Sequence, residues 1–193
     1  MALPKIAQAE MLASPFSDAL LRFAPESVAV IGCASGDGFD KIPVTVKRVV
    51  GVDINPNYIA SASFRYLGRI PDLEFNVANI QHAPLHFAPV DLIYAALVFE
   101  YVSLPASLSN LSRVCRLGGR LVSVLQQPSA HVHEVSPSPY MSVQALVPLM
   151  RLIPPTELAE GAKSFGFVLD SEKTLVLAIG KEFVVQVYYY AVG

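Results

Sequence analysis

Tryptophan is missing from this chain of 193 residues, cysteine occurs only twice, and charged side chains make up just 16% of the composition. The two cysteines, Cys33 and Cys115, are too few and too far apart for a disulfide framework or a zinc-binding pattern. We therefore expect free thiols and a cytoplasmic protein. Hydrophobic residues reach 53%, which excludes a disordered chain and favours strands buried on both faces.

Long uncharged apolar runs and clusters of basic residues are also missing. Asp91 and Glu100 interrupt the most hydrophobic stretch, and Glu10 and Asp18 interrupt the N-terminal segment. We therefore expect neither a membrane span nor a signal peptide. The net charge is -2, the pI is near 6.1, and the 14 basic residues are scattered along the chain. Nucleic-acid binding and membrane association are not expected.

Short apolar runs alternate with helical segments through the first two thirds of the chain. A helical segment within residues 1–26 ends near Arg22. Five runs with strand character then follow, at residues 27–32, 48–53, 73–79, 90–97 and 120–126. This alternation predicts an α/β fold with a doubly wound, mostly parallel sheet, and we expect residues 1–193 to form one domain.

Helix boundaries are marked by residues with specific capping roles. Asn55 and Pro56 are typical of a helix start, and a helix is expected through about Tyr66. The glycine pair 118–119 is expected to end the helix that carries residues 107–117.

The C-terminal third departs from this rhythm. Residues 127–155 are a mixture of Pro, Ser and His with one helix-like piece, and we interpret them as a lid-like insertion. A helix over 156–165 is expected to follow. Two β-rich runs within 174–192 are joined at Gly180-Lys181, which predicts an antiparallel hairpin.

A glycine-rich loop follows the first predicted strand. It reads GCASGDG over residues 32–38, and its small side chains let the backbone approach a ligand and offer amide N–H groups to it. Asp53 ends the next strand, where a doubly wound sheet places it beside the loop and where its carboxylate can accept both ribose hydroxyls. The alternative is that the glycines only make a tight turn and that Asp53 only caps the next helix.

These segments resemble the successive motifs of class I S-adenosylmethionine-dependent methyltransferases. The resemblance runs from Ser27 to Gln126 through VAVIGCASGDG, VVGVDINP, the segment around Asn79, VDLIYAALVFEYV and LSRVCRLGGRLVSV. It implies a three-layer, seven-stranded sheet of order 3-2-1-4-5-7-6 whose seventh strand is antiparallel, and the predicted hairpin fits this order. It also implies S-adenosylmethionine as the cofactor and methyl transfer to an acceptor.

The same resemblance implies the cofactor-binding positions. They are Gly32, Cys33, Ala34, Ser35, Gly36, Gly38, Asp53, Ile54, Asn79, Ile80 and Ala95. The loop would pack on the methionine part, Asp53 would bind the ribose, and Ala95 would lie near the sulfonium. Ile54, Asn79 and Ile80 would surround the adenine.

Three positions depart from the family pattern. Ala34 stands where glycine is common, so the loop must tolerate a methyl group or adopt an unstrained dihedral there. Asn79 replaces a frequent acid, although its amide oxygen can still accept a hydrogen bond from the adenine amino group. Pro43 comes five residues after Gly38 and should break the following helix early.

The acceptor side is less informative, because methyl transfer from an activated donor needs alignment more than acid or base groups. Candidates are Phe99, Glu100, Tyr101, His131, His133, Glu134 and Tyr140. Glu100 or His133 could act as a base, and Phe99, Tyr101 and Tyr140 could wall an acceptor pocket or belong to the core. The two histidines with Glu134 could suggest a metal cluster, but surface histidines are the expected account and no metal site is predicted.

A small molecule is the expected acceptor. The stretch after the fourth strand lacks the Asp/Asn-Pro-Pro-aromatic signature of relatives that methylate nucleic-acid amino groups, and Glu100 has no second glutamate as in protein-arginine methylating relatives. Two alternatives remain. An NAD-dependent dehydrogenase would need the G-x-G-x-x-G spacing, which the loop lacks. A non-catalytic, cofactor-binding or regulatory member of the fold is the other.

Overall fold

The computed structural model describes residues 4–128, 150–177 and 180–191. The helices are α1 (Pro4–Phe23), α2 (Pro56–Tyr66), α3 (Leu104–Arg113) and α5 (Pro155–Lys163), with 3-10 turns at η1 (Phe39–Lys41) and η2 (Phe99–Tyr101). The strands are β1 (Ser27–Ile31), β2 (Arg48–Asp53), β3 (Leu73–Val77), β4 (Val90–Ala96), β5 (Cys115–Gln126), β6 (Phe167–Val176) and β7 (Glu182–Tyr190).

All seven strands form one sheet of order β3-β2-β1-β4-β5-β7-β6. The first five strands pair in parallel, whereas β7 is antiparallel to both β5 and β6. The predicted fold class, strand order and C-terminal hairpin are therefore confirmed. The carboxyl ends of β1, β2 and β4 meet at one edge of the sheet, which is where open α/β sheets bind ligands.

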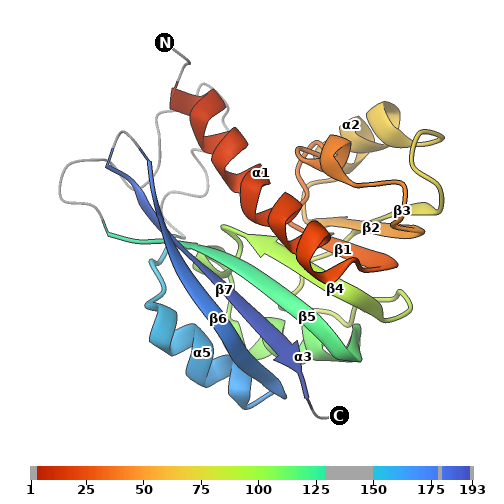
Figure 1. Ribbon diagram of the computed structural model, residues 1–193. Coiled ribbons are helices and arrows are strands. Elements are labelled where there is room, and N and C mark those ends of the chain that lie inside the picture. The colour runs from red at the N-terminus through yellow and green to blue at the C-terminus, as the bar shows by residue number, and fades with distance from the viewer. Residues whose placement is uncertain (1–3, 129–149, 178–179, 192–193) are drawn as a thin grey trace.

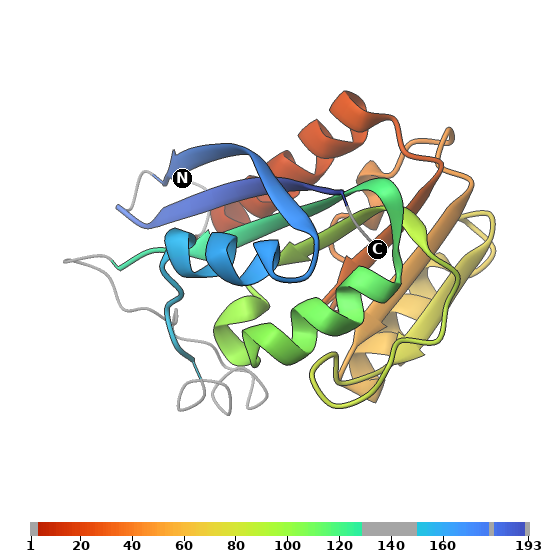
Figure 2. The same ribbon diagram turned by 90° about the horizontal axis from the view of Figure 1, so that it is seen from below.

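Helices cover both faces of the sheet (Figures 1 and 2). On one face α1 and α2 contribute Phe16, Leu20 and Ile59 to an apolar cluster with alternate strand residues. On the other face α3 and α5 contribute Leu108 and Leu158 to a second cluster with the remaining strand residues. The alternation of side chains along each strand thus divides the core in two.

Local sequence signals explain the boundaries around the cofactor edge. The side chain of Asn55 caps α2 by accepting a 3.0 Å hydrogen bond from the Asn57 N–H, and Pro56 occupies the first turn. After the glycine loop the chain forms only the three-residue turn η1. Pro43 follows at once, as expected from the missing N–H of proline.

Two boundaries differ from the sequence-based expectation. The helix before β5 ends at Arg113, and β5 begins at Cys115, before the glycine pair expected to end the helix. Pairing with β4 shifts between Val90↔Cys115 and Leu92↔Arg120, so the glycines lie in a bulge inside the strand. The hairpin is also longer than predicted, since β6 begins at Phe167.

Most of the predicted lid-like insertion lies outside the described residues. Of residues 127–155, the structure describes 127–128 and 150–155. Residues 150–154 have no regular structure, and α5 begins at Pro155. Within the described part of the chain, no helix is both long and apolar enough to span a membrane. Cys33 and Cys115 are buried free thiols, as expected.

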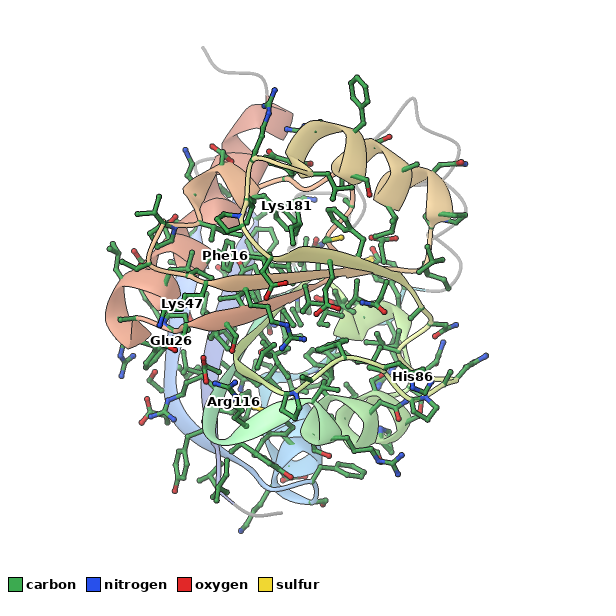
Figure 3. The ribbon with its side chains drawn as sticks, turned by 90° about the vertical axis from the view of Figure 1, so that its right-hand side faces the viewer. Phe16, Glu26, Lys47, His86, Arg116 and Lys181 are labelled. Carbon is green, nitrogen blue, oxygen red and sulfur yellow. The ribbon has the colours of Figure 1, made fainter. Side chains whose placement is uncertain are left out.

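Ion pairs link neighbouring segments at the edge of the sheet where the parallel strands begin. Lys47 bonds Glu26 at 2.7 Å, and the two lie side by side in Figure 3. Asp91 accepts hydrogen bonds from the N–H groups of Glu26 and Ser27 and pairs with Arg116 at 2.8 Å. This edge is therefore occupied by structural contacts.

Candidate functional site

The glycine loop lies at the carboxyl edge of β1 and is tied to β2. The N–H groups of Gly32 and Cys33 both donate to the carbonyl of Val52, at 2.8 and 3.1 Å. Gly32 has a φ of 68°, and a Cβ there would lie 2.7 Å from Val98 Cγ2. Gly36 has a φ of 81°, and a Cβ there would meet the Tyr66 ring at 2.7 Å. Both positions therefore require glycine.

Asp53 joins this loop to the start of α2. One carboxylate oxygen accepts a 2.9 Å hydrogen bond from the Ala34 N–H, and the other accepts a 2.8 Å bond from the Asn55 N–H. The residue is 9% exposed. A carboxylate oxygen can accept more than one hydrogen bond, so both oxygens retain capacity for a ligand's hydroxyls. Helix capping and ligand binding are thus compatible roles for this side chain.

Ala34 adopts a left-handed conformation with a φ of 45°. The unstrained dihedral considered from the sequence is therefore not what the chain adopts. The conformation costs roughly 1 kcal/mol for a residue with a Cβ. It places the Ala34 N–H on the Asp53 carboxylate, and this hydrogen bond to a charged acceptor offsets the strain.

A pocket of about 200 Å³ opens beside the loop. Its walls are Phe16, Val30, Ile31, Gly32, Cys33, Ala34, Asp37, Gly38, Tyr94 and Ala96. Four of the predicted positions, Gly32, Cys33, Ala34 and Gly38, therefore come together. The Phe16 ring closes the pocket from α1 and packs on Tyr94 with 4.7 Å between ring centroids.

Sequence reasoning missed Phe16, Asp37, Tyr94 and Ala96. Strand alternation could have indicated the last two, because Tyr94 and Ala96 project from the same face of β4. Ala95, the predicted neighbour of the sulfonium, belongs instead to the buried cluster on the α3 face. Ala96, one residue later, lines the pocket.

Residues predicted around the adenine follow β2 and β3 at the same edge. Ile54 is 62% exposed, an unusual state for a large apolar side chain next to a buried strand. Ile80 is buried. The Asn79 side-chain oxygen accepts a 3.2 Å bond from the Gln81 N–H and has one further lone pair. An apolar surface beside an amide oxygen suits an aromatic ring that carries an amino group.

Arg65 on α2 holds the outer part of the loop. Its guanidinium donates to the Ser35 carbonyl at 2.9 Å and pairs with Asp37 at 3.2 Å. Inside the loop, burial and the nearby Asp53 carboxylate raise the pKa of Cys33 to about 12. The Cys33 thiol is therefore protonated at neutral pH and is a packing group in this site.

Glu100 is the acidic residue of η2, the turn that follows β4. It is 1% exposed, and its Oε1 accepts a 2.8 Å bond from the Gln126 N–H at the end of β5. Its Oε2 is buried and has no hydrogen-bond partner in the described part of the chain. Burial raises the pKa of Glu100 to about 7, although the hydrogen bond from Gln126 acts in the opposite direction.

The remaining acceptor-side predictions have different outcomes. Phe99 is fully buried in the cluster on the α3 face, which places it in the core. Tyr101 is half-buried. Burial is the main cause that raises the pKa of its hydroxyl, and the nearby Glu100 charge is the second. His131, His133, Glu134 and Tyr140 lie outside the described residues. Across the residues that are described, no three His, Cys, Asp or Glu side chains gather as metal ligands.

Comparisons with known proteins agree with this geometry. A family model described as "Methyltransferase domain" matches residues 29–123, from β1 into β5. A curated protein from Mycolicibacterium smegmatis, named "Probable S-adenosylmethionine-dependent methyltransferase", is 32% identical over 99 residues. That match takes in 51% of this chain and 37% of the relative, so the chain aligns with little more than a third of the relative's length.

Solved structures share the fold at low sequence identity. The N-methyltransferase NodS from Bradyrhizobium japonicum, in complex with S-adenosylhomocysteine, aligns with a TM-score of 0.73 and 16% identity over 95% of this chain and 87% of NodS. A structure of the Haloferax volcanii Trm112 methyltransferase activator with its methyltransferase aligns with a TM-score of 0.74 and 16% identity, over 95% of this chain and 92% of the matched one. The strand order and loop geometry are those of class I S-adenosylmethionine-dependent methyltransferases, and residues 29–123 match the methyltransferase domain family.

Proposed function

We propose that the protein binds S-adenosylmethionine and transfers its methyl group to a small-molecule acceptor. The observation that carries the proposal is the contact between the glycine loop and Asp53, where the carboxylate accepts the Ala34 N–H at 2.9 Å and still has free lone pairs. A turn without a ligand needs neither a strained alanine nor a carboxylate held beside it.

The residues around the pocket fit the parts of this cofactor. The 200 Å³ pocket suits the methionine part, and Gly32 leaves room where a Cβ would meet Val98. Asp53 would hold the ribose. Ile54, Asn79 and Ile80 would hold the adenine, with the exposed face of Ile54 covered by the ring. When bound, the cofactor supplies an activated methyl group on a sulfonium.

Alignment and exclusion of water are the main tasks left to the protein in such a transfer. Phe16 and Tyr94 wall the pocket with aromatic rings, and Ala96 keeps the space beside the methyl group small. Glu100 is 1% exposed, accepts the Gln126 N–H and does not line the pocket, so its raised pKa alone does not make it the base for an acceptor that arrives protonated.

A small acceptor is favoured over a nucleic acid by the pairing of basic side chains. Lys47, Arg48 and Arg116 at the amino edge are bonded to acidic partners at 2.6–2.8 Å. Arg65 is engaged with the loop. Phosphate binding needs basic groups that are free to replace counterions, and these are committed to structural contacts.

A dinucleotide is disfavoured by the chain that follows the loop. A pyrophosphate needs the N-terminus of a helix, whose free N–H groups and dipole attract the anion. Here the loop runs into the three-residue turn η1, which ends before Pro43. We expect no NAD binding.

Calorimetric titration with S-adenosylmethionine, S-adenosylhomocysteine and NAD tests the proposal. We expect micromolar binding of the two adenosyl ligands and none of NAD. Absence of adenosyl binding would overturn the cofactor assignment. Formation of S-adenosylhomocysteine during a screen of small-molecule acceptors would then separate an enzyme from a non-catalytic cofactor-binding protein, which binds but does not turn over.

A further inference from the structure

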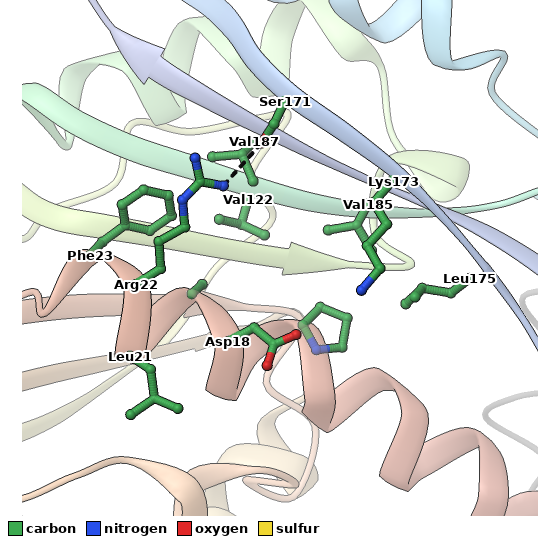
Figure 4. Close-up of a pocket in the computed structure, with 12 residues that line it drawn as sticks. Asp18, Leu21, Arg22, Phe23, Val122, Ser171, Lys173, Leu175, Val185 and Val187 are labelled. Atoms are coloured by element: carbon green, nitrogen blue, oxygen red, sulfur yellow. Dashed lines mark hydrogen bonds between the residues drawn. The ribbon is translucent and has the colours of Figure 1, made fainter.

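The outer strands of the sheet are covered unequally on their two faces. Below β6 and β7, α5 packs Leu158 and Ala162 against Phe167 and Tyr188. On the opposite face α1 reaches only part of the way across the sheet (Figure 1). A groove of about 520 Å³ lies between this helix and β6 (Figure 4). This volume lies in the usual range for small-molecule sites.

The floor of the groove is apolar. Val122 of β5, Val187 and Val185 of β7 and Leu175 of β6 project from the same face of the sheet, and Pro15 and Ala19 of α1 form the opposite wall. Val185 and Leu175 remain only half-buried. An apolar ligand that covered them would gain about 25 cal/mol for each Å² removed from water.

Charged groups are confined to the rim. Near the C-terminal end of α1, Arg22 donates to Asp170 at 3.1 Å and to Ser171 at 3.2 Å, so an acidic partner balances its charge. Asp18 and Lys173 also line the groove, and neither forms an ion pair or a hydrogen bond in the described part of the chain. Figure 4 shows both side chains extending over the groove from opposite sides.

These charges define what the groove would accept. The unpaired Lys173 ammonium would attract an anionic group whose apolar part rests on the valines. Asp18 would repel a second negative charge on the same ligand. We propose that the groove is a binding site for a small amphiphilic monocarboxylate, an apolar chain or ring that carries one carboxylate group.

This site is distinct from the pocket beside the glycine loop. Phe16 of α1 lines that pocket and packs on Tyr94, whereas its neighbour Pro15 lines the groove. The helix therefore stands between the two spaces. The proposal does not depend on methyl transfer, and binding in the groove can be measured without the cofactor.

Decanoate and decyltrimethylammonium are suitable probes, because they pair the same chain with opposite charges. We expect calorimetry to show decanoate binding at one site, with the cation weaker. Lys173→Met should weaken decanoate binding about two- to fivefold, the range for an exposed ionic contact, and Asp18→Asn should strengthen it. Lys163→Met, on the opposite face of the sheet, is the matched control and should change nothing.

Filling the groove gives a second test. Val185→Phe should reduce decanoate affinity at least tenfold, whereas Val176→Phe, at a 64% exposed position of β6, should not. Retained S-adenosylhomocysteine binding would verify that each variant is folded and would keep the two proposals separate. If Val185→Phe unfolds the chain, the decanoate affinities of the Lys173→Met and Asp18→Asn variants still test whether decanoate binds in the groove.

Three results would overturn the proposal. The first is no decanoate binding at millimolar concentration. The second is equal binding of both probes, or binding indifferent to Lys173→Met and Val185→Phe, which would place it elsewhere. The third is concentration-dependent self-association that Val185→Phe abolishes, since the groove would then be a contact between two copies of the chain.

Discussion

Replacement of Asp53 by alanine removes the link between the glycine loop and the start of α2. The carboxylate accepts the N–H groups of Ala34 and Asn55 at 2.9 and 2.8 Å, and in the proposed complex it also accepts ribose hydroxyls. Hydrogen bonds to a charged group contribute about 1.5–3 kcal/mol. We therefore expect Asp53→Ala to weaken S-adenosylmethionine binding by roughly 10- to 150-fold.

The same substitution also costs stability, so a matched control is needed. Asp91 is a second carboxylate that accepts two backbone N–H groups, those of Glu26 and Ser27, but at the opposite edge of the sheet. Asp53→Ala and Asp91→Ala should each lower the free energy of unfolding by about 2–3 kcal/mol. Only the first should change the affinity.

Calorimetry at a temperature where both variants are folded, with denaturant unfolding of each, makes the comparison. Wild-type affinity in Asp53→Ala would refute the role assigned to the carboxylate. An equal loss of affinity in both variants would show that the effect of Asp53 is a general loss of structure and not a contact with the ligand.

Three further outcomes concern the loop and the end of β4. Ala34→Gly should raise the free energy of unfolding by about 0.5–1 kcal/mol, because glycine adopts the left-handed φ without strain; thermal unfolding measures this, and a lower midpoint would contradict it. Gly36→Ala should destabilise the chain by about 2 kcal/mol or more, since its Cβ would meet the Tyr66 ring at 2.7 Å, and the same scan provides the comparison. Glu100 has a folded pKa of about 7, above its ordinary value of 4.5, so the native state holds more protons than the unfolded state between these values and stability falls as pH rises through that window. This fall in the free energy of unfolding amounts to up to about 3 kcal/mol, and Glu100→Gln should remove it. Denaturant unfolding at several pH values measures it, and the same pH dependence in wild type and variant would exclude a raised pKa.

Elements with local signals could be predicted from the sequence. Asn55 and Pro56 set the start of α2 through a side-chain cap and a fixed φ, both properties of adjacent residues. Pro43 limits the turn after the glycine loop in the same way. By contrast, Gly118 and Gly119 resemble a helix stop locally, yet β4 pairs on both sides of them and makes them a bulge inside β5.

In the site, too, some features depend on local sequence and others on contacts between distant segments. Asp53 and the loop glycines could be placed from their spacing, because consecutive parallel strands bring them to one edge. Which of Ala95 and Ala96 faces the pocket depends on which face of β4 is covered by α1 and which by α3, and this is a property of the folded sheet. Phe16 carries no signal at all, since its contact with Tyr94 joins residues far apart in the chain and depends on how α1 lies across the sheet.

The strand order also sets a sequence of events during synthesis. Residues 120–126 of β5 pair with residues 183–189 of β7, so the two halves of this ladder leave the ribosome more than fifty residues apart. Until β7 arrives, β5 is the edge of a partly built sheet, with Leu121, Val124 and Leu125 near open backbone groups. Such edges recruit other strands. The C-terminal hairpin therefore also acts as the cover that ends the period in which the nascent chain is prone to aggregate.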